Sequence, residues 1–217
     1  MKSKALLLQL IFLFATPILY GQNVSNRTEF WVNTGITSEL LSVNATKLGS
    51  FKNRNRLGAS LGLEVRSCFK KEFSLNYGLQ IKSFRKSYIF NAREVFIQDL
   101  NLYIPIVLNY NLKITDKNYV NVLLGLNGII QTPRYAYFAT NDYQIEVKRK
   151  VGFFPNLKFG FGYKFSNKRS FEINAIYNMG FFQKNIEIVN YVPAESRVEL
   201  KSNGSFVEIE FQFKLSK

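Results

Sequence analysis

Apolar and polar residues alternate strictly at the carboxyl end of the chain, which reads FVEIEFQFKL over residues 206–215. From Val207 to Leu215 every second side chain is apolar, and the positions between carry glutamate, glutamine and lysine. A period of two places these two sets on opposite faces of a β-strand. The stretch therefore predicts a strand with one apolar face and one polar face.

The same alternation recurs along most of the chain and predicts eight strands. Their apolar positions lie within residues 30–36, 57–65, 73–81, 100–110, 120–126, 157–165, 171–181 and 207–215. With their flanking residues, most of these segments reach the roughly 9 to 11 residues that a tilted strand needs to cross a bilayer. The pattern indicates an all-β protein whose strands are long enough to span a membrane.

The segments between the strands alternate between short and long. SCFKKE, KITDKN and SNKRS are short, whereas the gaps at about residues 38–56, 84–96, 131–150 and 183–204 are long. This order is typical of a membrane barrel with tight periplasmic turns and long external loops, and a soluble sandwich gives no reason for it. We therefore predict an eight-stranded antiparallel up-and-down transmembrane β-barrel with both chain ends on the periplasmic side.

Side-chain volume predicts which face of the strands points inward. The apolar positions are rich in Phe, Leu and Tyr, whereas the opposite positions carry mainly Gly, Ser, Asn, Lys and Glu. The interior of an eight-stranded barrel is just filled by side chains, so the large apolar set belongs outside. The alternative, with the faces reversed, is a soluble lipocalin-like barrel that binds a lipid in an apolar cavity.

The amino end has the build of a secretory signal peptide. Lys2 and Lys4 precede an apolar run from Ala5 to Ala15, and small or turn-forming residues follow up to Gly21. The alternative is a transmembrane anchor, but an anchor needs about 20 apolar residues and this run is shorter. We expect a signal peptide at residues 1–21, a barrel domain at residues 22–217, and a location in the outer membrane after cleavage.

The strand LNLYIPIVLNYNL, residues 100–112, resembles the IP-containing strand of the PorT-like outer-membrane β-barrel proteins of Bacteroidota. The signal ending YGQ and the glycine-rich strands LGASLGLEV and FGFGYKF are also similar to that family. The resemblance covers essentially the whole mature chain. It implies an eight-stranded outer-membrane barrel of a family whose roles are mostly unassigned, and it supplies no catalytic residues. One member of the family is associated with protein secretion and gliding.

The residues present argue against catalysis and against a cofactor. The chain has no histidine, which excludes His-based triads and histidine zinc sites. Glu208 and Glu210 form a carboxylate pair of the kind that glycosidases use. The competing interpretation is a lumenal network of these glutamates with Lys82, Lys158 and Arg66, because buried charges are tolerated when they are paired. We expect a protein that is not an enzyme and holds no cofactor.

Counting outward from a predicted turn gives the facing residues of its two strands. A turn centred on Lys168 sets Lys164 directly against Glu172, and side chains opposed in this way are within reach of an ion pair. Lys214, near the end of the last strand, is expected to approach Glu172 or Glu29. These pairs predict a belt of charges at the periplasmic mouth of the barrel.

The same count applied to the first short connection adds another pair. A turn centred on Phe69 sets Arg66 against Glu72. The expected belt plugs the barrel and takes no part in catalysis. Its residues form the candidate lumenal charge network: Arg66, Glu72, Lys164, Glu172, Lys214 and Glu29.

The formal net charge of +14 indicates anionic partners. A secreted chain does not meet nucleic acid, so the expected partners are outer-membrane lipid, the anionic headgroups of glycolipids, and a protein of the envelope. The function expected is that of a non-enzymatic integral outer-membrane barrel, structural or binding a partner through its loops, with a narrow channel as the alternative. The cations assigned to the external loops are Lys47, Lys52, Arg54, Arg56, Lys86, Arg93, Lys148, Arg149, Lys150 and Lys201.

Overall fold

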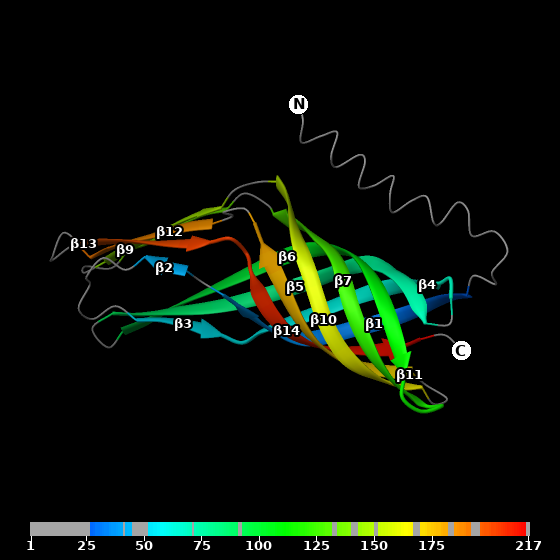
Figure 1. Ribbon diagram of the computed structural model, residues 1–217. Coiled ribbons are helices and arrows are strands. Elements are labelled where there is room, and N and C mark those ends of the chain that lie inside the picture. The colour runs from blue at the N-terminus through cyan, green and yellow to red at the C-terminus, as the bar shows by residue number, and fades with distance from the viewer. Residues whose placement is uncertain are drawn as a thin grey trace.

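Eight long strands close into an antiparallel barrel in the computed structural model (Figure 1). Each barrel strand pairs with the barrel strands before and after it in the chain, and the last pairs with the first. The predicted fold class is confirmed. The barrel strands are β1 (Arg27–Glu39), β4 (Gly58–Cys68), β5 (Phe73–Phe90), β6 (Arg93–Lys113), β7 (Asn118–Gln131), β10 (Gly152–Ser166), β11 (Ser170–Gly180) and β14 (Phe206–Lys214).

The structure describes most of the mature chain that the sequence predicts. The described residues are 27–40, 42–44, 52–70, 72–90, 93–131, 134–139, 143–149, 152–166, 170–181, 185–191 and 196–215. The predicted signal peptide lies outside these ranges. Among the residues described, no helix is both long enough and apolar enough to cross a membrane.

The short connections β4–β5, β6–β7 and β10–β11 lie at one end of the barrel, together with the carboxyl end of the chain (Figure 1). We call this end the turn end. The hairpin of β10 and β11 has the predicted register, because Ser166 pairs with Ser170 and Lys164 pairs with Glu172. The predicted facing of Lys164 and Glu172 is confirmed.

The turn between β4 and β5 is centred two residues later than predicted. Cys68 pairs with Ser74, so Arg66 lies opposite Asn76 rather than opposite Glu72, which is exposed. Moving the centre of a turn by two residues shifts the strand register by four and leaves every side chain on its own face. Alternation therefore does not distinguish the two registers, and the predicted pairing of Arg66 with Glu72 is wrong.

The long connections contain further strands. Five of them form a second sheet in the order β2-β13-β12-β9-β8, and β3 pairs with β5. They lie beyond the end of the barrel that is opposite the turn end, which we call the extension end (Figure 1). These strands are β2 (Ser42–Asn44), β3 (Lys52–Arg56), β8 (Arg134–Ala139), β9 (Tyr143–Arg149), β12 (Asn185–Tyr191) and β13 (Ser196–Ser202).

The gap predicted at residues 84–96 is the upper part of a long hairpin. β5 and β6 remain paired as far as Phe90 and Arg93. Lys86 and Ser87 point to opposite faces of β5, yet both are buried. The outward positions Ser83, Arg85 and Ser87 are polar, so this part of the strand lacks the alternation of apolar and polar residues seen nearer the turn end. Lys86, which the sequence assigned to an external loop, lies inside the barrel.

The barrel turns its apolar face outward. On β14, Val207, Ile209 and Phe213 are 42%, 45% and 46% exposed, whereas Glu208 and Glu210 are 2% and 1% exposed. The same division holds on the other barrel strands, where exposed Leu, Ile and Phe alternate with buried Asn, Gln, Glu and Lys. The arrangement is the predicted one. It excludes the lipocalin-like alternative, whose interior would be apolar.

Ile209→Arg tests the outer face of β14. The substitution should lower the free energy of unfolding in lipid by about 2–4 kcal/mol, because it places a charge near the middle of the hydrocarbon region. Gln98→Arg is the matched control, since Gln98 is exposed on β6 close to the extension end. Near the membrane boundary the same residue should cost only about 0–1 kcal/mol. Wild-type stability of Ile209→Arg would mean that β14 presents its other face to the lipid.

Candidate functional site

The inward side chains of β14 mark successive levels of the lumen. From the turn end they are Lys214, Gln212, Glu210, Glu208 and Phe206. All but Lys214 are at most 2% exposed. Charged and amide side chains therefore occupy the lower levels, and an aromatic side chain occupies the uppermost. Each level draws partners from other strands across the lumen.

Arg66 on β4 is the centre of the network near the turn end. It holds Glu172 of β11 through two hydrogen bonds, with Nη1 donating to Oε1 at 2.5 Å and Nη2 donating to Oε2 at 3.1 Å. Nη2 also donates to Oε1 of Gln212 at 2.8 Å and lies 3.4 Å from Oε1 of Glu64. The guanidinium stands 4.1 Å from the centroid of the Trp31 ring. Such bidentate pairs are the strong ones in a site from which water is excluded.

A second group closes the mouth at the turn end. Lys214 Nζ donates to Oε1 of Glu29 at 2.5 Å, and Trp31 Nε1 donates to Oε2 of Glu29 at 3.1 Å. Lys164 Nζ lies 3.4 Å from Oε1 of Glu172, and the Lys164 side chain is 16% exposed. These rim pairs are wetter than the Arg66 pair, so each contributes less to stability.

A third group lies midway along the barrel. Lys82 Nζ donates to both carboxylate oxygens of Glu208, at 2.7 and 2.5 Å, and both side chains are fully buried. The hydroxyl of Ser60 donates to Oε1 of Glu208 at 2.6 Å. Lys158 Nζ lies 3.7 Å from Oε2 of Glu210. The two glutamates of β14 thus lie in a lumenal network, in keeping with the second interpretation of the sequence.

An aromatic layer lies above this third group. Phe84, Tyr103 and Phe206 pack together with Ile129. The ring centroid of Phe206 is 5.1 Å from that of Phe84 and 5.6 Å from that of Tyr103. Lys82 Nζ lies 5.6 and 5.5 Å from the Tyr103 and Phe206 rings. The layer separates the charged levels from the extension end.

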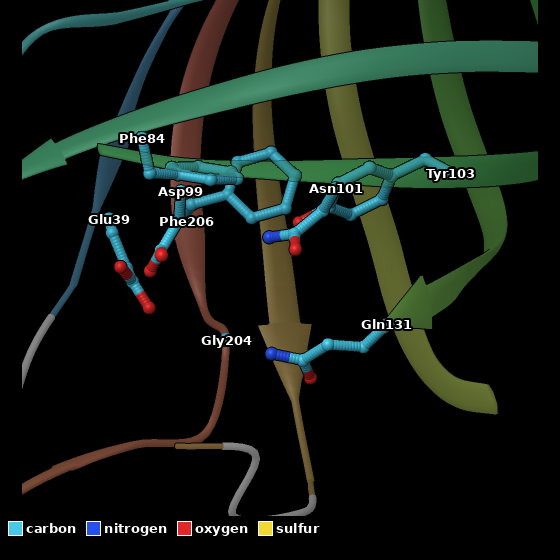
Figure 2. A pocket seen from close by; sticks show the side chains of 8 residues that line it. All are labelled: Glu39, Phe84, Asp99, Asn101, Tyr103, Gln131, Gly204 and Phe206. Carbon is cyan, nitrogen blue, oxygen red and sulfur yellow. The ribbon is translucent and has the colours of Figure 1, made fainter. Parts of the chain in front are cut away.

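A small cavity lies beside the aromatic layer, toward the extension end (Figure 2). Its volume of about 10 Å³ is close to that needed for one water molecule. Lys86 Nζ lies 2.9 Å from Oε2 of Glu39 and 3.7 Å from Oδ2 of Asp99, and Ser202 donates to Glu39. The cavity is lined by Glu39, Phe84, Asp99, Asn101, Tyr103, Gln131, Gly204 and Phe206.

The structure assembles five of the six residues of the candidate lumenal charge network. Glu72 stays outside, exposed beside the β4–β5 turn. The other five form two contacting groups, which are Arg66 with Lys164 and Glu172, and Lys214 with Glu29.

Sequence reasoning missed two sets of lumenal residues. Trp31 and Glu64 lie on the inward faces of β1 and β4, and the alternation that placed Arg66 inward also applies to Glu64 two positions earlier. Lys86, Glu39 and Asp99 had no comparable signal. They lie where strands continue into the extension, and there the alternation fades.

The acidic side chains of the buried levels are engaged with cations or amides. Glu172 and Glu208 each receive two hydrogen bonds from one cation. Glu210 accepts from Gln80 at 3.1 Å and from Gln212 at 2.7 Å. Over the described part of the chain, no three or more His, Cys, Asp or Glu side chains are arranged to hold a metal ion. The arrangement joins the walls of the barrel through paired charges.

Known proteins with similar structures are outer-membrane barrels. The outer membrane protein OprG from Pseudomonas aeruginosa matches with a TM-score of 0.51 at 13% identity, covering 89% of this chain and 99% of that chain. Ail of Yersinia pestis, solved in complex with the heparin analogue sucrose octasulfate, matches with a TM-score of 0.38 at 13% identity, covering 87% of this chain and 99% of that chain. The likeness to OprG is one of fold, and this chain has the fold of an outer-membrane β-barrel. No protein-family model and no curated protein sequence matches the chain.

Glu172→Gln tests the network at its centre. We expect it to lower the free energy of unfolding by about 3–5 kcal/mol, because it leaves the buried Arg66 without its main counterion. The double variant Arg66→Met with Glu172→Gln should lose less stability than Glu172→Gln alone, because it removes both charges and leaves neither one unpaired. Glu72→Gln is the control and should change stability by no more than about 0.5 kcal/mol. Unfolding of the wild type, Arg66→Met, Glu172→Gln and the double variant forms a double-mutant cycle, and strictly additive effects of Arg66 and Glu172 would contradict the pairing.

Proposed function

We propose that this chain is a non-enzymatic integral protein of the outer membrane, in which a closed barrel anchors a binding structure built on the extension end. The observation that carries the proposal is the closure of the lumen. Arg66 and Glu172 join β4 to β11, and Lys82 and Glu208 join β5 to β14. In the ring of eight strands each pair spans two intervening strands. Both pairs therefore cross the lumen.

The aromatic layer supports the same conclusion independently. Phe84, Tyr103 and Phe206 are at most 3% exposed and pack against each other across the interior. An ion entering from the extension end would have to part these rings before it reached Lys82. Eight strands leave little room for another route, because their side chains just fill the interior.

The outer surface supports a location in the outer membrane. An apolar band surrounds the barrel, and its side chains have nothing to pack against except the surrounding solvent. In lipid this band is stable, and the closed ring of strands satisfies its backbone hydrogen bonds without water. The turn end then faces the periplasm and the extension end faces outward.

The extension supports contact with a protein of the envelope. A tilted strand crosses a bilayer in about 9–11 residues, whereas β5 and β6 have 18 and 21 residues. Their remaining length stands beyond the membrane, at the same end of the barrel as the second sheet (Figure 1). Within the described residues, the edge strands of that sheet each have one partner, since β2 pairs with β13 and β8 pairs with β9. Open edges of this kind accept an added strand from another chain.

A finer assignment rests on the sequence resemblance to the PorT-like barrels. The most specific element of this resemblance is the segment of residues 100–112. It lies in β6, where alternate side chains face the lumen and the lipid. We propose that the chain belongs to this family and that its extension end binds a protein of the envelope. The alternative function, a narrow channel, requires the lumenal pairs to open.

Closure of the lumen predicts the electrical behaviour of the protein. The wild-type protein in a planar bilayer should show no resolvable single-channel steps, because the charge pairs and the aromatic layer both block the lumen. A variant with Arg66→Ser, Glu172→Ser, Lys82→Ser, Glu208→Ser, Phe84→Ala and Phe206→Ala removes both crossing pairs and two of the rings, and it should conduct. Reproducible conductance steps from the wild-type protein would overturn the closed barrel and favour the channel.

A further inference from the structure

Three arginines gather on the outer face of the barrel wall at the extension end. Arg54 and Arg56 alternate along β3, and Arg85 lies on the neighbouring strand β5. The strand register sets Arg56 directly opposite Arg85 and Arg54 opposite Ser87. Phe84 and Lys86, on either side of Arg85 in sequence, point inward. The three guanidinium groups therefore share the outward face.

The register of these arginines is unfavourable on its own. Like charges directly opposite each other across two strands destabilise a sheet. Arg56 has a counterion, because its Nη2 donates to Oε1 of Glu94 at 2.5 Å. Hydrogen bonds from Ser87 and Arg56 hold the pKa of Glu94 below its usual value. Among the described residues, Arg54 and Arg85 form no ion pair, and Glu94 attracts both Arg54 and Arg56. Three arginines thus share one carboxylate, and the cluster keeps a net positive charge.

Strand length places the cluster at the outer boundary of the membrane. β5 begins at Phe73, and about ten residues of a tilted strand cross the hydrocarbon region. Arg85 therefore lies just beyond it. The apolar band ends directly below, where Leu57, Ile81 and Leu100 are 65%, 50% and 61% exposed. The guanidinium groups are thus at the height of the lipid headgroups.

The cluster occupies one side of the barrel. At the same end, the exposed outward residues of β10 and the residues that follow β1 and β11 include Phe153, Leu40 and Phe181. None of these carries a charge. The register of β3 on β5 is what brings Arg54, Arg56 and Arg85 together.

We propose that the outward face of β3, β5 and β6 binds the phosphate groups of an outer-leaflet glycolipid. The proposal rests on the outer-membrane location proposed above. A planar guanidinium donates two parallel hydrogen bonds to a phosphate, and one phosphate between Arg56 and Arg85 is shared by both. Its charge removes the repulsion between the two arginines. Leu100, exposed on β6 below the cluster, then contacts the apolar part of the lipid, and Phe96 lies beneath the Arg56 guanidinium.

The first test is equilibrium binding of diphosphoryl lipid A to the purified protein in an uncharged detergent. The variant with Arg54→Gln, Arg56→Gln and Arg85→Gln should bind about tenfold more weakly than the wild type. A charge-matched control carries Lys70→Gln, Lys113→Gln and Lys117→Gln at the exposed turn end and should bind like the wild type. Equal losses of affinity in the two triple variants would mean that net charge alone causes the weaker binding. This result would overturn the site.

A second measurement separates the site from a folding defect. Without lipid, Arg85→Gln should unfold at the same temperature as the wild type or higher, because it removes the opposed charges. Diphosphoryl lipid A should raise the unfolding temperature of the wild type and have a smaller effect on Arg85→Gln. Dephosphorylated lipid A should not distinguish the two proteins. Equal stabilisation of both proteins by the phosphorylated lipid would overturn the proposal. This result would not contradict the proposed closure of the lumen, because the conductance measurement tests that closure separately.

Discussion

The narrow interior of an eight-stranded barrel is the constraint on which the rest of this structure depends. Its side chains just fill the space between the walls, so a charge that points inward has little water to solvate it and must find a counterion within reach. Arg66, Glu172, Lys82 and Glu208 meet this requirement in two pairs that cross the lumen. Each pair connects strands that are not neighbours in the sheet. The charges that need partners therefore also hold opposite walls of the barrel together.

The exterior and the function follow from the same constraint. Because the polar side chains fill the inside, the large apolar side chains stand on the outside, and only a lipid environment accommodates them all around the ring. We propose that a lumen filled in this way leaves no open path. In the proposed function, recognition falls to the parts of the chain beyond the membrane, namely the upper hairpin of β5 and β6, the second sheet, and the arginine cluster on the outer face at their base.

The features that the sequence predicted are mainly those set within one strand or between two neighbouring strands. Alternation predicted all eight barrel strands and their faces, because inward and outward environments differ at every second residue. Counting from the turn predicted the facing of Lys164 and Glu172, which are cross-strand neighbours. It failed for Arg66 and Glu72, because two registers four residues apart satisfy the same alternation. The partner that Arg66 does have, Glu172, lies three strands away around the ring, and such contacts depend on the tilt and stagger of the strands.

The upper hairpin of β5 and β6 shows a second limit of prediction from alternation, because a strand can continue where the alternation stops. β5 continues past Ile81 through a segment whose outward positions Ser83, Arg85 and Ser87 are polar, and the alternation disappears although the strand does not. Lys86 was therefore assigned to a loop, and its contacts with Glu39 and Asp99 inside the barrel were not foreseen. The arginine cluster was likewise seen only in part. Arg54 and Arg56 were noted as external cations, but their position opposite Arg85 and Ser87 requires the register of β3 on β5.

The single tryptophan of the chain offers the most direct test of which face points inward. Trp31 is fully buried in the lumen beneath the Arg66 guanidinium. Its fluorescence in vesicles of brominated phospholipid should match that in ordinary phospholipid, because the barrel wall separates the indole from the acyl chains. A variant with Trp31→Phe and Ile209→Trp places the indole on the lipid face and should be strongly quenched. Strong quenching of Trp31 itself by the brominated lipid would contradict a polar, charge-paired interior.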